Sequence, residues 1–140
     1  MENTEVTTFG YGQWHNLGSG WRARVDRPTS SDTKPHVHVE NGKIKAVENV
    51  DGTNSHGSNM TKKGVPKSVQ KKVKSLNDYK KAQKDLSNMK KAKSQIRAKK
   101  LNLKKAGDIV IAIGIFVAVV GLMIFASGSI GLWGPFLLAI

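Results

Sequence analysis

The chain of 140 residues contains no cysteine, so disulfide bonds and thiolate metal sites are excluded. Its first residues carry no apolar run behind a basic stretch, and no secretory signal peptide is predicted there. The sequence also has no Walker A, GxGxxG, GxSxG or HExxH motif. The usual signatures of nucleotide binding, serine hydrolysis and zinc proteolysis are therefore missing.

Acidic residues become scarce after residue 60. Residues 1–60 hold six Lys/Arg against seven Asp/Glu, residues 61–105 hold seventeen against two, and residues 106–140 hold only Asp108. These partial charges of −1, +15 and −1 sum to the formal net charge of +13. We accordingly divide the chain into a small head (1–60), a lysine-rich helix (61–106) and an apolar tail (107–140).

The tail contains no charged residue from 109 onward, and residues 109–126 are all apolar or glycine. As a helix, this stretch would be roughly 27 Å long, which is close to the bilayer's hydrocarbon thickness of about 30 Å. The sequence therefore predicts a single C-terminal transmembrane helix. Whether residues 127–140 complete the span or lie at the membrane interface stays open.

Four lysines precede this stretch, and no charged residue follows it. Because positive residues stay on the cytoplasmic side, we expect a cytoplasmic head and an outside C-terminus in a single-pass, tail-anchored protein. The side chains expected at the lipid head groups are Lys99, Lys100, Lys104, Lys105 and Trp133.

The segment before the tail has neither glycine nor proline between Pro66 and Gly107. Its apolar residues recur in steps of three or four, which predicts one long helix over residues 67–105. The apolar stripe consists of Val69, Val73, Leu76, Tyr79, Ala82, Leu86, Met89, Ala92 and Ile96. A narrow, drifting stripe suits a partner helix, so a homo-oligomer through this helix is expected. The lysines suit nucleic acid, an acidic protein partner, or simply solubility.

In the head, Asn41-Gly42 between alternating segments predicts a β-hairpin with a two-residue loop, which would pair Val39 with Ile44. One face would then carry Val37, Val39, Ile44 and Ala46, and the other His36, His38, Glu40, Lys43, Lys45 and Val47. The alternating "WRARVD" predicts a third strand with its arginines on the histidine face. The candidates to cover the apolar face are Trp14, Trp21, Val69 and Val73.

Three interpretations of the histidine face remain open. In a metal-independent nuclease, His36 and His38 would be the catalytic acid and base. The phosphate-binding residues would be Arg22, Arg24, Lys45 and His56.

In the second interpretation the two histidines bind a divalent metal, with Glu40, His15 or His56 as a further ligand. In the third they are only solvated side chains of a hairpin. Neighbouring Arg and Lys would repel a cation, so neither a metal nor another cofactor is predicted.

Four stretches follow one another along the chain: "GWRARVDRP", "KPHVHVENGK", "NVDGTNSHG" and "VPKSVQKKVK". Over about residues 12–75 this order resembles a small module at the C-terminal ends of bacterial polymorphic or contact-dependent toxins. The matching positions are 24–26, 36–39, 51–56 and 66–72. The resemblance implies a toxin-like or effector-like setting and favours the nuclease interpretation.

Together these patterns predict an α+β protein: a small antiparallel β-meander head, a long basic α-helix and a single C-terminal transmembrane helix. The function expected first is that of a bacterial membrane protein presenting a small cytoplasmic binding module, with the lipid bilayer as partner. The alternatives are a toxin-like nuclease and a membrane-active, pore-forming protein.

Overall fold

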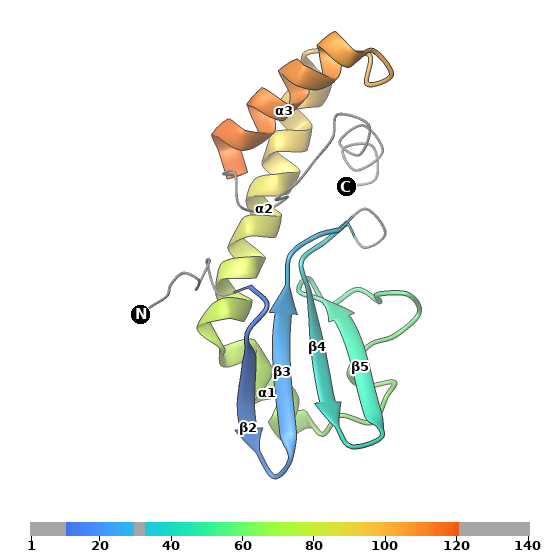
Figure 1. Cartoon of the computed structure of the whole chain (residues 1–140), viewed down its shortest axis with the longest axis vertical. Helices are drawn as coiled ribbons and strands as arrows, with labels where there is room; N and C mark the ends of the chain where they lie inside the picture. The colour runs from blue at the N-terminus through green and yellow to red at the C-terminus, as the bar shows by residue number, and fades with distance from the viewer. Residues whose placement is uncertain (1–10, 30–32, 121–140) are drawn as a thin grey trace.

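The computed structural model describes residues 11–29 and 33–120, which form a four-stranded antiparallel sheet and three helices (Figure 1). The elements are β2 (Trp14–Gly18), β3 (Trp21–Asp26), β4 (His36–Asn41), β5 (Ile44–Asn49), α1 (Lys67–Ser75), α2 (Asn77–Ala98) and α3 (Ala106–Val120). The strands follow one another in the order β2-β3-β4-β5. The α+β class and the antiparallel meander agree with the prediction, to which the structure adds β2 as a fourth strand.

The two faces of the sheet differ in what lies over them. Helix α1 and the first part of α2 lie over one face, called here the covered face, and the rest of α2 runs past the sheet beside α3 (Figure 1). Alternating side chains of the strands are buried on the covered face. Its buried apolar residues are Trp21, Ala23, Val25, Val37, Val39 and Ala46. The opposite face, called here the open face, has no described helix over it. Trp21, Val69 and Val73 are buried as expected, whereas Trp14 lies on the open face.

The β4–β5 hairpin turns one residue later than predicted. Asn41 pairs with Ile44 and Val39 pairs with Ala46, so the two-residue loop is Gly42-Lys43 rather than Asn41-Gly42. Only Gly42 of these two has a positive φ, 57°, which fits a type II′ turn with glycine at its first central position. Because every pairing shifts by two positions, each side chain keeps its predicted face.

The lysine-rich region forms two helices rather than the single one predicted. Leu76 separates α1 from α2 with an extended backbone (φ −62°, ψ 138°). The Ser75 hydroxyl donates to the Lys72 carbonyl at 2.7 Å, a local bond that competes with helix continuation. The break redirects the chain so that α1 packs near β2, while α2 contacts β3 and then runs on to α3 (Figure 1). The stripe on which a homo-oligomer was expected is thereby mostly buried within one chain, from Val69 to Ile96.

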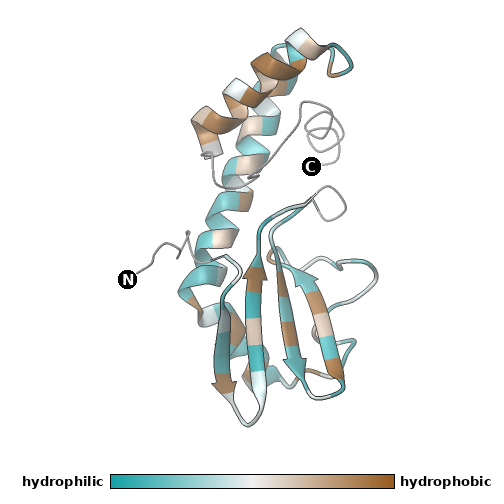
Figure 2. Ribbon diagram, viewed as in Figure 1, coloured by the Kyte–Doolittle hydropathy of each residue, from teal (hydrophilic) through white to brown (hydrophobic). Residues whose placement is uncertain are grey.

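Helix α3 corrects the prediction of a membrane span. It has 15 residues, and no helix in the part of the chain described is long and apolar enough to cross a membrane. The tail-anchored, single-pass arrangement, its predicted orientation and the predicted membrane function are therefore wrong. Figure 2 shows α3 as the most apolar helix, folded back beside the more polar α2. Its buried residues Ile109, Ala112 and Phe116 are three and four positions apart and therefore lie on one stripe of the helix. These apolar residues, which were predicted to face lipid, belong to the hydrophobic core.

The residues predicted at lipid head groups have no membrane helix beside them in the described chain. Lys99 and Lys100 follow α2, and Lys104 and Lys105 precede α3, all in the connection between the two helices. The remaining part of the predicted span, residues 121–126, lies outside the described residues, as does Trp133.

Candidate functional site

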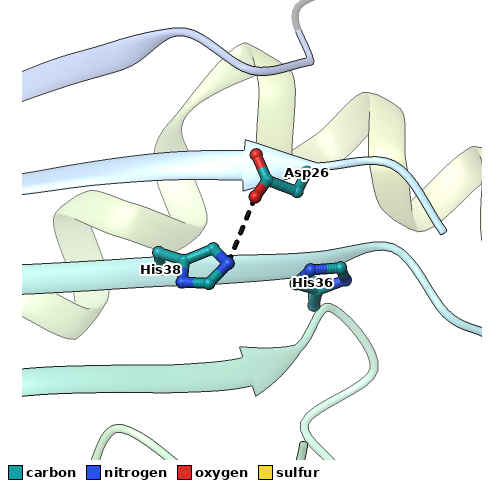
Figure 3. Close-up of side chains that lie close together, drawn as sticks. All are labelled: Asp26, His36 and His38. Carbon is teal, nitrogen blue, oxygen red and sulfur yellow. Dashed lines mark ion pairs between the residues drawn. The ribbon is translucent and has the colours of Figure 1, made fainter. Parts of the chain in front are cut away.

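Three side chains that can carry chemistry meet at one end of the open face: Asp26, His36 and His38 (Figure 3). His38 Nε2 lies 3.1 Å from Asp26 Oδ2. The two imidazole rings meet edge to face with centroids 5.3 Å apart. One nitrogen or oxygen from each residue lies within 4.8 Å of those of the other two. This group is called here the His–Asp cluster.

Strand register creates the cluster. His36 and His38 are two residues apart on β4, so both project to the same face. Asp26, at the end of β3, pairs directly with His36 and lies diagonal to His38, whose direct partner is Arg24. Three residues of two adjacent strands are thus held on the sheet's hydrogen-bonded backbone.

The neighbours of each ring define its protonated nitrogen. His36 Nδ1 lies 2.9 Å from the backbone carbonyl of Lys34. A carbonyl oxygen only accepts, so Nδ1 carries the hydrogen and Nε2 is the ring's acceptor atom when His36 is neutral. By the same argument His38 donates from Nε2 to Asp26, which leaves Nδ1 as its proton-accepting atom.

Asp26 is held by Arg24. The guanidinium donates from Nε to Oδ1 and from a terminal nitrogen to Oδ2, both at 2.8 Å. Burial by itself would raise the pKa of Asp26, but hydrogen bonds from His38 and Arg24 and their positive charge lower that pKa on balance. Asp26 is therefore an ionised carboxylate at neutral pH with its orientation fixed at both oxygens.

The two histidines differ in access. His36 is only 5 % exposed, whereas the His38 side chain is 26 % exposed. A molecule approaching the open face therefore meets His38 first, because little of His36 is exposed beside it.

Predicted phosphate-binding residues surround the cluster unevenly. Arg22, Arg24 and Lys45 lie on the open face as expected from the strand alternation. Arg22 is paired with Glu40 at 3.0 Å. His56 lies in the turn between Ser55 and Ser58, beyond β5, and is not part of the cluster. The structure thus brings three of the four onto the same surface.

Of the metal ligands considered from the sequence, His36 and His38 belong to the cluster, but the further ligand differs. Neither Glu40 nor His15 belongs to it, and His15 instead contacts Asp78 at the start of α2. The third residue of the cluster is Asp26, which was not among the predicted site residues. The signal was present, because "WRARVD" alternates and places Asp26 in phase with Arg22 and Arg24.

Trp14 was expected to cover the apolar face of the sheet but lies on the open face. It is 37 % exposed and pairs with Arg24 across β2 and β3. The guanidinium of Arg22 lies 3.9 Å from the ring centroid and that of Arg24 4.8 Å. These cation–π contacts hold both arginines on the open face.

No protein-family model, no curated protein and no solved structure matches this chain. The likeness to bacterial toxin modules therefore stays a prediction.

Proposed function

We propose that the open face of the sheet cleaves RNA without a metal ion, with His38 and His36 as the proton-transferring residues. The observation that carries this proposal is the contact between His38 and Asp26 on the face that the described helices leave uncovered. An imidazole oriented by a buried or half-buried carboxylate is a recurrent arrangement for proton transfer.

RNA is the favoured substrate because it contains its own nucleophile. The 2′ oxygen attacks the neighbouring phosphorus as the bond from phosphorus to the 5′ oxygen breaks. His38, through Nδ1, takes the 2′-hydroxyl proton, and His36 in its protonated form gives a proton to the departing 5′ oxygen from Nε2. The products are a 2′,3′-cyclic phosphate and a 5′-hydroxyl, so neither water activation nor a metal is required for this step.

The arginines act at different distances from this reaction. Arg24 commits two of its five N–H donors to Asp26 and is a positioning residue. Arg22 and Lys45 are the cations of the open face that can approach a bound phosphate, whose charge increases during the transfer.

The lysine-rich helices supply attraction rather than chemistry. Helix α1 holds four lysines and α2 seven basic residues, which makes eleven against the two aspartates of α2. Helix α1 and the start of α2 lie on the opposite side of the sheet, and the rest of α2 runs past it (Figure 1). These lysines would raise the local concentration of a polyanion without belonging to the cluster. An acidic protein remains the alternative partner for these lysines.

The test is cleavage of a single-stranded RNA by the full chain in EDTA, compared with a DNA of the same sequence and an RNA carrying one 2′-deoxy nucleotide. We expect cleavage of RNA with cyclic-phosphate ends, no cleavage of DNA, and no cleavage at the deoxy position. His38→Ala should lower the rate by about 10²–10⁴-fold, the usual contribution of a positioned acid or base.

His15→Gln is the matched control, because His15 is a histidine of the same sheet that contacts α2 instead of the cluster. Circular dichroism of each variant separates lost chemistry from lost folding. Absence of cleavage by the folded parent chain, or equal cleavage by His38→Ala, would overturn the proposal.

A further inference from the structure

We infer that the His–Asp cluster also binds one divalent transition-metal ion of the zinc type, through Asp26, His36 and His38. Two imidazole nitrogens and one carboxylate oxygen are a donor set that zinc accepts. The inference rests on the geometry of these three side chains and not on the proposed cleavage of RNA.

The separations are within reach of a shared ion. Ligand atoms about 2.0–2.2 Å from one zinc ion lie roughly 3.4 Å from one another in a tetrahedral site. His38 Nε2 and Asp26 Oδ2 are 3.1 Å apart, and one ligand atom from each of the three residues lies within 4.8 Å of those of the other two. The ligand atoms therefore need to approach one another by at most about 1.4 Å, which side-chain rotation on a fixed sheet supplies.

Outer contacts favour metal binding at His36 in particular. Metal-ligating histidines usually donate their second ring N–H to a carbonyl or carboxylate, which orients the ring. His36 Nδ1 donates to the Lys34 carbonyl at 2.9 Å, so Nε2 is the nitrogen that can bind an ion. Arg24 orients Asp26 in the same way, through two bonds of 2.8 Å.

Neighbouring cations were expected to repel a metal ion, but in the structure ion pairs offset part of this repulsion. Arg24 is ion-paired with Asp26 and Arg22 with Glu40, so both positive charges are offset locally. The remaining repulsion makes this site weaker than a structural zinc site, and its occupancy therefore varies with the metal concentration.

Metal binding and proton transfer exclude one another. His38 Nε2 cannot hold both the hydrogen that it donates to Asp26 and a metal ion. An ion bound through His38 Nε2 would break that contact and occupy His36 Nε2, the nitrogen that donates a proton in the proposed cleavage. Zinc is therefore expected to inhibit the protein rather than to activate it.

The test is titration of the full chain with Zn²⁺ by calorimetry and with Co²⁺ by its visible absorption, in the absence of RNA. We expect one ion per chain and a rise in Tm with metal concentration. Asp26→Asn, His36→Gln and His38→Gln should each weaken binding by more than the roughly 10–100-fold that losing an outer partner costs. His15→Gln should bind like the parent chain.

Two results would overturn the inference: no binding by the folded parent chain, or unchanged binding in all three cluster variants. Either result leaves RNA cleavage in EDTA unaffected, so the two proposals fail separately. A cluster variant that does not fold, as judged by circular dichroism, is replaced by the other two, which remove different ligands from different strands.

Discussion

The two faces of the sheet are built from alternate residues of the same strands, yet they have opposite physical characters. On β4, Val37 and Val39 are fully buried on the covered face, whereas His38 between them lies on the open face. On β3, Ala23 and Val25 alternate with Arg24 and Asp26 in the same way. Burial on the covered face supplies the stability, so the open face can hold charged and titratable groups that contribute little to folding. Neighbouring residues of one strand therefore serve different roles: one stabilises the fold and the next is available for chemistry on the open face.

The largest expected effect comes from placing a charge on the covered face. Val39 is 0 % exposed, and Val39→Asp would bury an unpaired carboxylate at a cost of about 4 kcal/mol or more. We expect no cooperative unfolding transition in urea for this variant. Val47→Asp, on the open face opposite His38, should remain folded. Equal destabilisation by both substitutions would remove the distinction between the faces.

The next effect extends the comparison to α3, which also has a buried and an exposed side. Phe116 is 0 % exposed and Ile111 is 51 % exposed. We expect Phe116→Ala to lower the free energy of unfolding of the full chain by about 3–5 kcal/mol. Ile111→Ala should change it by no more than about 0.5 kcal/mol. If Ile111→Ala were as costly as Phe116→Ala, the packing of α3 described here would be wrong.

A smaller effect is expected at the ion pair between Lys34 and Asp51, which lies outside the strands. Burial by itself would raise the pKa of Asp51, but hydrogen bonds from Lys34 and Thr53 lower it to about 2. Because this folded-state pKa is below the ordinary value of about 3.9, the stabilisation is present above pH 4 and is lost between pH 4 and pH 2. After solvent screening, Asp51→Asn should cost about 1 kcal/mol at pH 7.

Urea unfolding at a series of pH values checks this expectation. The free energies of unfolding of the parent chain and Asp51→Asn should converge as the pH falls to 2. A difference that stays constant over this range would show that the carboxylate's charge is not what stabilises the loop.

The smallest effect is expected for the ion pair of the open face. Arg22 and Glu40 are 3.0 Å apart, with side chains 52 % and 22 % exposed. A double-mutant cycle of Arg22→Gln and Glu40→Gln should give a coupling of about 0.2–1 kcal/mol that weakens with added salt. A coupling well above this range would mean that the open face, too, carries part of the stability.

Period-two alternation was enough to assign Val37 and Val39 to one face and His36 and His38 to the other, and the shifted turn left this assignment intact. The interruption at Leu76 was not predicted, because its helix-forming neighbours give a continuous apolar stripe. The apolar segment after residue 108 was predicted to span a membrane, whereas its described part packs on α2.

The sequence by itself determined the alternation of the strands, the helical periodicity of the basic segment and the distribution of charge, because these depend on residues near one another along the chain. The tertiary structure decided which residues meet across strands and helices. Asp26 lies beside His36 and His38 only because β3 pairs with β4. Ile109 and Phe116 join the core only because the chain reverses direction and packs α3 against α2. Local periodicity specifies which side of an element is apolar, but only packing specifies what that side contacts.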